Sequence, residues 1–410
     1  MDNRGVQFQY LTGAPHSVLH KANRCMHDKN KSQPSTFMDH LLRLYPQAPT
    51  KISGAGELVP KSYQLLQYDF KKGSDIEFKD PNGSTEEENS LKSETSAINR
   101  LLTFNSPSKL TQELRKLMNS EKYSLEFFTP SVPNFINSHM IEPVCNDGKP
   151  VQLGSGCFGT VFLAALNNNI RRLVAVKFIR KNVASINDII KEASFNSQLS
   201  RIHGTPCPEF FGLAKIESNE KFHSLALVSE FIGNENNLKS LTLYQLLRLG
   251  KRAFQKGSRL PFTDRDLVAI LLHIISALAA IHHRSVYVND LKADNILLRK
   301  EVNGWCTYIV DLGHATYGHQ RAKFDLGNLT EEEYLSEYRQ VAPETVYYGQ
   351  CGPCSDVYSF GNIINKIYKS MRIQIGKIEE LIDLCRKRDP RARPSTLWIS
   401  KELEIIFNSI

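Results

Sequence analysis

The chain has 410 residues, which is enough for one large domain with an extension or for two domains of typical size. Its hydrophobic fraction of 41% and aromatic fraction of 9% provide for a packed core and argue against a wholly disordered protein. The formal net charge of +8 is a small basic excess with acidic residues spread throughout. Such a balance is typical of a solvated surface; it suits an anionic ligand such as a nucleotide but does not predict binding to nucleic acid.

The N-terminal residues contain no apolar core of a secretory signal. The most apolar run, residues 267–283, carries Ser276 and three histidines and is short for a membrane span. Eight cysteines in a long chain without an extracellular signal are most simply reduced thiols. We therefore expect an intracellular, cytoplasmic protein without a membrane span.

Residues 1–144 form a region of different composition, in which polar, turn-rich stretches alternate with two segments of helical spacing. The turn-rich stretches are residues 27–36, 45–56 and 79–94, and the helical ones are 36–45 and 108–128. This pattern predicts an N-terminal extension that is largely loop or disordered with short helices. Helices of this kind can dock on another protein, so partner binding is one interpretation of the extension.

From about residue 145 the sequence shows closely spaced patterns of strands and helices. Residues 149–166 read as strand, glycine turn and strand, followed by strands at 172–181 and 224–233 and a helix at 185–202 that opens with Ser185 and Asp188. Further on we expect helices at 241–256 and 264–283, a loop at 284–295, short strands at 296–298 and 308–310, and then more helix. Strands followed by helices predict an α+β fold with a small lobe at 145–232 and a larger helical lobe at 233–410.

A glycine-rich turn, Gly154, Gly156 and Gly159, matches G-x-G-x-x-G. Alone it is a weak signal, because a structural hairpin is the default reading. A strand follows it where a dinucleotide fingerprint requires a helix, and Lys177 comes next in Val-Ala-Val-Lys. Glycines let the backbone approach phosphates, and Lys177 adds a positive charge. We expect Glu192 to anchor this lysine, with a solvated surface glutamate as the alternative.

Four polar residues come late in the chain. Asp290, Lys292 and Asn295 lie in the loop after a long apolar helix, and Asp311 directly follows a strand. Phosphoryl transfer needs a carboxylate to accept the proton of a hydroxyl, and oxygen ligands for magnesium. Asp290 fits the first role, and Asn295 with Asp311 fits the second. Each alone is more often a turn or cap residue; their order favours phosphoryl transfer.

With these residues in this order, the segment from about residue 145 to the C-terminus resembles a eukaryotic protein kinase domain, closest to the serine/threonine tyrosine-kinase-like group. The resemblance implies a catalytic role for Asp290 and Lys292. It implies a lysine–glutamate ion pair and nucleotide binding by Leu153, Gly154, Gly156, Gly159, Val161, Ala175, Lys177, Glu192, Ser229, Glu230 and Leu297. It also implies that Asp290, Lys292 and Asn295 form the catalytic loop, that Asp356 supports this loop, and that Arg393 pairs with Glu344 of Ala-Pro-Glu.

Several positions depart from the family pattern. Val288 and Asn289 replace its histidine and arginine before Asp290. That arginine normally receives a phosphate on the activation segment, which the resemblance places at residues 311–344. We therefore predict activity that does not depend on this switch. Leu312 replaces the usual phenylalanine after Asp311, and Asn196 lies where the family has an apolar residue. A short stretch between residues 361 and 389 predicts a reduced docking helix in the larger lobe.

A dithiol sequence, Cys351-Gly352-Pro353-Cys354, allows a redox or zinc interpretation. No strand leads into Cys351 and no second ligand pair has suitable spacing. We therefore favour a turn in which both cysteines pack as small apolar groups, followed by a helix capped by Ser355 or Asp356.

The predicted function is transfer of the terminal phosphoryl group of ATP, with Mg²⁺, to protein serine or threonine hydroxyls. Lys292 favours these hydroxyls, whereas Glu337 and Tyr338 occupy a place where such kinases have a threonine. One alternative is a kinase-shaped scaffold with weak or no catalysis, since fold alone does not establish function. A small-molecule kinase is disfavoured by Lys292, Glu344 and Arg393.

Overall fold

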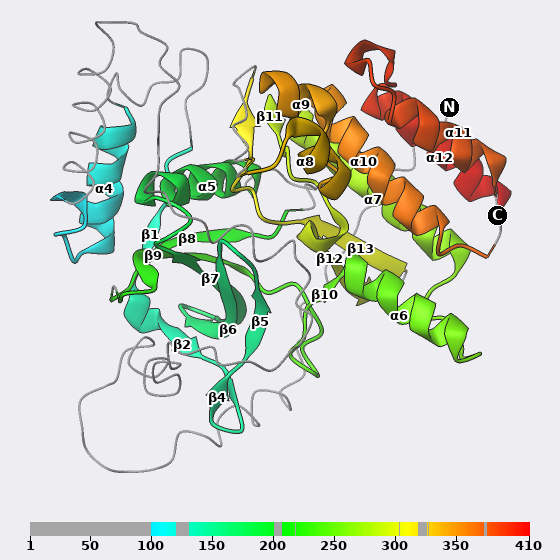
Figure 1. Ribbon diagram of the computed structural model, residues 1–410. Coiled ribbons are helices and arrows are strands. Elements are labelled where there is room, and N and C mark those ends of the chain that lie inside the picture. Colours follow the sequence, from blue (N-terminus) through cyan, green and yellow to red (C-terminus); the bar gives the residue numbers. More distant parts are fainter. Residues whose placement is uncertain are drawn as a thin grey trace, which may run out of the picture.

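The computed structural model describes residues 100–119, 131–200, 207–217, 219–302, 304–318, 326, 328–372 and 375–410. The expectations for residues 27–94 lie outside these ranges, as does the end of the helix expected at 108–128. Within the described residues a curled sheet is followed by a group of helices (Figure 1). The predicted order of strands first and helices later is confirmed, and this arrangement is consistent with two lobes.

The sheet has seven strands in the order β1-β8-β9-β7-β6-β2, with β5 paired to β6. All pairs are antiparallel except β1 with β8. Its strands are β1 (Phe135–Ile136), β2 (Ile141–Pro143), β5 (Gln152–Ser155), β6 (Gly159–Asn167), β7 (Arg171–Arg180), β8 (Phe210–Lys215) and β9 (Phe222–Glu230). Strands β1 and β2 precede residue 145, so the sheet includes residues that lie before the expected start of the small lobe. A separate hairpin pairs β3 (Cys145–Asn146) with β4 (Lys149–Pro150).

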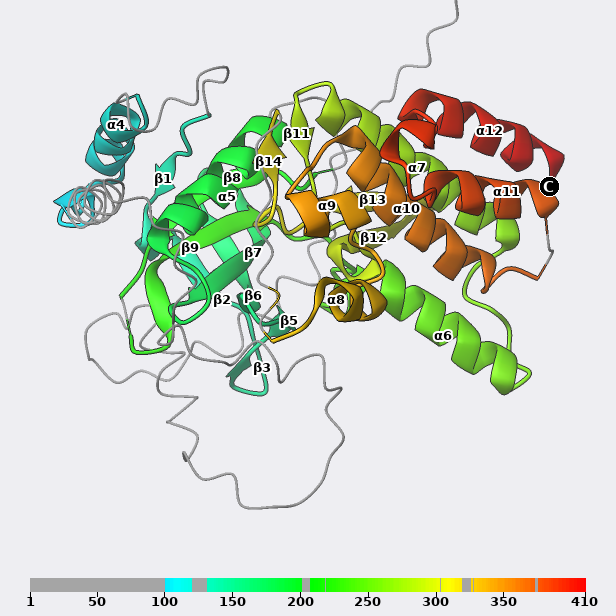
Figure 2. The same cartoon turned by 45° about the horizontal axis from the view of Figure 1, so that its top comes forward.

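Helix α5 (Ile186–Leu199) packs on β8 and β9. It begins as predicted at Ser185, because the Ser185 hydroxyl accepts the amide of Asp188 and the Asp188 carboxylate accepts the amide of Ser185, at 3.2 and 2.8 Å. This reciprocal cap fixes where the helix starts. Helix α4 (Pro107–Met118) lies beside β1, at the end of the molecule farthest from α11 and α12 (Figures 1 and 2).

The helical part is built around α7, whose buried residues join one large hydrophobic cluster. Its helices are α6 (Leu243–Gln255), α7 (Asp264–His282), α8 (Glu331–Glu337), α9 (Pro343–Tyr348), α10 (Pro353–Tyr368), α11 (Gly376–Cys385) and α12 (Thr396–Ser409), with short 3₁₀ turns at Ala293–Asn295 and Pro390–Ala392. A further 3₁₀ turn, Ser138–Met140, lies between β1 and β2 in the sheet. Small sheets join β10 (Leu241–Thr242), β12 (Ile296–Glu301) and β13 (Gly304–Ile309), and β11 (Val286–Tyr287) with β14 (Thr316–Tyr317).

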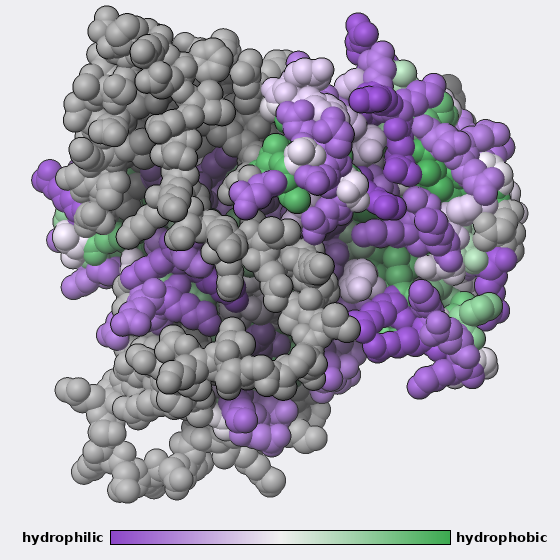
Figure 3. Space-filling model, in the orientation of Figure 1, coloured by the Kyte–Doolittle hydropathy of each residue, from purple (hydrophilic) through white to green (hydrophobic). Residues whose placement is uncertain are grey.

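Helix α7 is long and apolar enough, by length and composition alone, to cross a membrane. Half of its most apolar window is buried inside the protein, where Leu271, Ile274 and Leu278 contribute to the core. Packing therefore accounts for its composition. The outer surface of the helical part seen in Figure 3 is mainly hydrophilic, with apolar residues scattered between the helices.

Helix α10 begins earlier than its sequence suggests. It starts at Pro353 with Gly352 as the residue before it, so Ser355 and Asp356 lie inside the helix and the prediction that one of them caps it was wrong. Proline is favoured in the first turn, because its fixed φ suits a helix and its missing N–H has no partner there. Cys351 is buried and Cys354 is half-buried within the helix.

Candidate active site

The glycine turn joins β5 to β6, and its three glycines differ in their surroundings. A side chain at Gly159 would collide with the backbone carbonyl of Phe178 on β7, so this position requires glycine for packing. A side chain at Gly154 or Gly156 would meet nothing within 4 Å. Packing does not explain these two glycines. Open space above them is what close approach of a ligand to the backbone requires.

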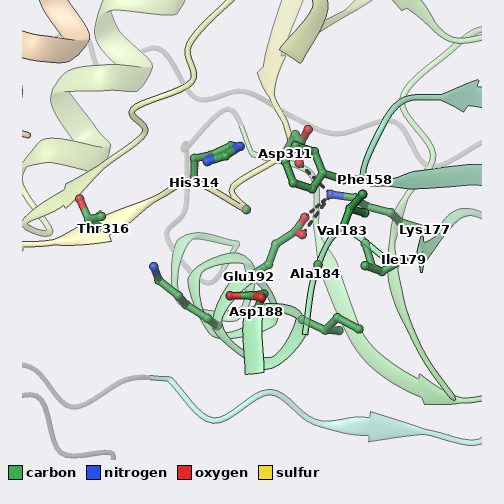
Figure 4. Close-up of a pocket in the computed structure, with 13 residues that line it drawn as sticks. Phe158, Lys177, Ile179, Val183, Ala184, Asp188, Glu192, Asp311, His314 and Thr316 are labelled. Atoms are coloured by element: carbon green, nitrogen blue, oxygen red, sulfur yellow. Dashed lines mark hydrogen bonds and ion pairs between the residues drawn. The ribbon is translucent and has the colours of Figure 1, made fainter. Parts of the chain in front are cut away.

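Lys177 on β7 lies between two carboxylates (Figure 4). Its Nζ donates to Glu192 Oε1 and Oε2 on α5 at 2.7 and 3.0 Å, and to Asp311 Oδ1 at 2.7 Å. The predicted ion pair is therefore present. Burial opposes the charge on Lys177, but the two carboxylates outweigh it and raise the pKa of Lys177 above its usual value.

The two carboxylates respond differently to the same lysine. Burial tends to raise the pKa of Asp311, but Lys177 outweighs this effect, so the pKa of Asp311 falls below its usual value. For Glu192, burial and the nearby Asp311 prevail over Lys177, and its pKa lies above the usual value. Asp311 also adopts φ of +66°, a left-handed conformation that costs energy for a residue with a side chain. The surrounding contacts hold it there.

Asp290 lies in the loop between α7 and β12 and is buried. Lys292 Nζ donates to its Oδ2 at 2.6 Å, and Asn295 Nδ2 donates to its backbone oxygen at 3.0 Å and to Oδ2 at 3.2 Å. Burial acts against the charge of Lys292, yet Asp290 raises the pKa of this lysine above its usual value. Three residues singled out from the sequence thus form one hydrogen-bonded group.

Asp356 of α10 is hydrogen-bonded to the start of this loop, and the residue is 0% exposed. Its carboxylate accepts the backbone amides of Val288 and Asn289, both at 2.8 Å, and His282 Nε2 lies 2.8 Å from Oδ2. The contact to His282 was not anticipated from the sequence.

Asn289 adds a link that the sequence did not predict. Its Nδ2 donates to the carbonyl of His314 at 2.9 Å and to Thr316 Oγ1 at 3.0 Å, which joins the catalytic loop to the start of the activation segment. Its φ is +62°, a region that asparagine tolerates better than most residues. Two features of the sequence could have pointed to this role: asparagine tolerates a positive φ, and it stands where the family has an arginine. The Val288 side chain is fully buried and can only pack, while its backbone amide donates to Asp356.

The end of the activation segment is held by a buried ion pair. Arg393 donates to both carboxylate oxygens of Glu344, at 2.6 and 2.9 Å, and to the carbonyl of Cys354 at 2.9 Å. The Arg393 side chain is 0% exposed. The predicted pairing of Arg393 with Glu344 is therefore present, and together with the bond to Cys354 it ties the turn at Pro390–Ala392 to α9 and α10.

Six of the residues expected to bind nucleotide lie on strands of both parts of the molecule. They are Leu153 (β5), Val161 (β6), Ala175 (β7), Ser229 and Glu230 (β9) and Leu297 (β12). Ala175 and Ser229 are directly opposite in the β7–β9 register. All six are half-buried, whereas neighbours such as Val176, Val228 and Leu298 are buried. An ion pair of 2.9 Å between Glu230 and Arg299 of β12 joins the two parts at this edge.

A cavity of about 370 Å³ lies beside Lys177 and α5, and none of these six residues lines it (Figure 4). It is lined by β7, the first turns of α5 and the segment from Asp311 to Thr316. Phe158, at the tip of the glycine turn, meets His314 edge-on with ring centroids 5.1 Å apart. The glycine turn thus reaches down to the activation segment beside the cavity.

The metal ligands expected from the sequence are Asn295 and Asp311. Among the described residues no group of three or more histidine, cysteine, aspartate or glutamate side chains could hold a metal ion. An amide with one carboxylate fits an ion that takes its remaining ligands from phosphates and water. The Asn295 Nδ2 is occupied by Asp290, which turns the amide oxygen away from that carboxylate. These two side chains therefore fit a hard, oxygen-liganded cation.

A family model for the protein kinase domain matches residues 149–378, more than half of the chain. This segment contains the glycine turn, Lys177, Glu192, the Asp290 loop and Asp311. The chain belongs to the protein kinase family.

Proposed function

We propose that this protein transfers the terminal phosphoryl group of ATP to serine or threonine hydroxyls of protein substrates. The observation that supports this best is the completeness of the polar groups: Lys177 bridges Glu192 and Asp311, while Asp290 is bonded to Lys292. None of the groups that phosphoryl transfer requires is missing. The finer assignment to the tyrosine-kinase-like group, and an intracellular, cytoplasmic location, belong to the same proposal.

Each group has a chemical task in this proposal. The open backbone at Gly154 and Gly156 and the ammonium of Lys177 would bind the phosphates, with Glu192 keeping that ammonium in place. Asn295 and Asp311 would hold Mg²⁺, which supplies neutralisation of phosphate charge. Asp290 would orient the substrate hydroxyl and accept its proton.

Lys292 carries the preference for serine and threonine. Its Nζ is 2.6 Å from the Asp290 carboxylate, so it stands beside the position where the hydroxyl would be activated. There it can stabilise negative charge on the phosphoryl group as it moves. The six half-buried residues between the sheet and β12 would receive the adenine ring.

The test is transfer from labelled ATP, with Mg²⁺, to a generic protein substrate by the full chain, beside an Asp290→Asn variant. We expect incorporation into phosphoserine and phosphothreonine, reduced at least 100-fold in the variant, since removing the group that accepts the proton typically costs this much. Incorporation that persists in the variant, or is absent from both proteins, contradicts catalysis.

The second candidate is a kinase-shaped scaffold, favoured by the polar Asn196 on α5, whose Nδ2 bonds the carbonyl of Glu192 within its own helix instead of packing. A scaffold would bind nucleotide without transferring phosphate. Nucleotide binding measured by calorimetry beside the transfer assay separates the two candidates, and the N-terminal extension would then be the first place to search for partners.

A further inference from the structure

Helix α4 and residues 131–136 lie before the matched kinase segment, yet they contribute to the core of the sheet. We call these two pieces the brace. One face of α4 is buried at intervals of four residues, as Leu110, Leu114 and Met118. These side chains share one hydrophobic cluster with Phe135 of β1, with strands β7 to β9, and with α5. The α5 members of this cluster are Ile189, Ile190 and Ala193.

Hydrogen bonds join the brace to α5 in two steps. Thr111 Oγ1 of α4 accepts the backbone amide of Phe135 at 2.9 Å. Two buried hydroxyls of α5 then reach Ser131: Ser194 Oγ donates to its carbonyl at 2.8 Å, and the hydroxyls of Ser197 and Ser131 are 3.1 Å apart. The brace is therefore attached to the middle and the end of α5.

On the side of α5 that faces away from the brace, the first turns of the helix have fewer packing partners than its end. Near its end, Tyr317 of β14 donates to Gln198 at 2.8 Å. The first turns, with Asp188, Ile189 and Glu192, line the 370 Å³ cavity instead. This pocket leaves room for the helix to move toward the segment from Asp311 to Thr316. Such a movement would draw α5 away from its packing on β8 and β9 and from its hydrogen bonds to the brace.

We propose that the brace positions α5, and that Leu110 and Leu114 are positioning residues for the Lys177–Glu192 ion pair. These two leucines do not touch the ion pair; they act on it through the hydrophobic cluster that they share with α5. This inference rests on the proposed function, because it assigns the brace a task in keeping the phosphate-binding lysine in place. It makes part of the region before residue 145 a requirement for activity.

The test compares Leu114→Ala with Leu403→Ala, each in the full chain. Both leucines are 0% exposed, but Leu403 lies on α12, which packs on α7 in the helical part. Two readouts are measured below the unfolding transition: kcat/KM for peptide phosphorylation, and hydrogen exchange of α5 amides without nucleotide. We expect Leu114→Ala to lower kcat/KM about tenfold and to speed α5 exchange. Leu403→Ala should leave both near wild type.

A double-mutant cycle separates positioning from general loosening. If α5 is already displaced in Leu114→Ala, adding Glu192→Gln should lower kcat/KM little further. The fold-loss of kcat/KM in the double variant should then be smaller than the product of the two single fold-losses. Losses that multiply, or α5 exchange at the wild-type rate in Leu114→Ala, would overturn the proposal. Glu192→Gln combined with Leu403→Ala should show independent effects.

Thr111→Val keeps the proposal testable should Leu114→Ala not fold. Valine preserves the shape but removes the acceptor for Phe135, whereas Thr111→Ser retains it. We expect faster α5 exchange in the valine variant only; equal exchange in both contradicts the brace. Hydrogen exchange needs no catalysis, so a wild-type protein without transfer activity would refute the proposed function and leave this readout to decide the brace.

Discussion

Replacing Asn289 tests how the catalytic loop is joined to the activation segment. Asn289→Ala removes two hydrogen bonds from a buried side chain, those to His314 and Thr316. Each such bond contributes about 0.5–1.5 kcal/mol net. Alanine at φ of +62° adds about 1 kcal/mol of backbone strain that asparagine partly avoids. The free energy of unfolding should therefore fall by about 2–4 kcal/mol.

The assay is equilibrium unfolding in urea, with Asn289→Gly and Thr316→Val measured beside it. Glycine loses the same two bonds without the strain, so it should be about 1 kcal/mol more stable than alanine at this position. Thr316→Val removes one of the two acceptors and should cost about 1 kcal/mol. A stability of Asn289→Ala within about 0.5 kcal/mol of wild type, or a glycine variant below the alanine variant, would refute the reasoning.

Three further predictions concern other parts of the molecule. Arg393→Ala leaves the buried Glu344 carboxylate without its cationic partner and should cost about 3–5 kcal/mol in the same unfolding assay; a loss below about 1 kcal/mol contradicts the pairing. Burial raises the pKa of Cys207 and of Cys385 to about 12, so both stay protonated at pH 7.5 and an alkylating reagent should miss them in the native protein. Peptide mass spectrometry that finds either one labelled would disprove this. Finally, phosphatase treatment should leave transfer activity unchanged, because Asn289 makes its contacts to the activation segment without a phosphate; a marked loss argues for the switch.

The elements with strong local signals were predictable. The strand expected at 172–181 is β7 at Arg171–Arg180, and the helix expected at 185–202 is α5, whose start at Ser185 follows from local capping. The pairs Lys177–Glu192 and Glu344–Arg393 were found through the family pattern. In each case the sequence contains either a periodic run or a known motif.

What escaped prediction depends on contacts between distant segments. Apolar spacing in 108–128 indicated a helix, but no local pattern says that Leu114 packs in a cluster with α5. The bonds of Asn289 depend on where residues 314–316 come to lie. The start of α10 was predicted wrongly because the polar Ser355 and Asp356 resemble caps. Instead, Ser355 donates to Glu344, and Asp356 accepts backbone amides of the catalytic loop.

The grouping of Lys177 between two carboxylates has an electrostatic consequence. Together with the neighbouring Lys292–Asp290 pair, it places two positive and three negative side chains around the proposed phosphate site. Arg180, which donates to the Cys157 carbonyl and to Ser155 Oγ, adds a third cation at the glycine turn. The opposite charges around the proposed phosphate site therefore balance one another, and partial burial strengthens each pairwise interaction. A bare polyphosphate would find little net positive charge there, so a divalent cation that accompanies the nucleotide would supply the missing attraction.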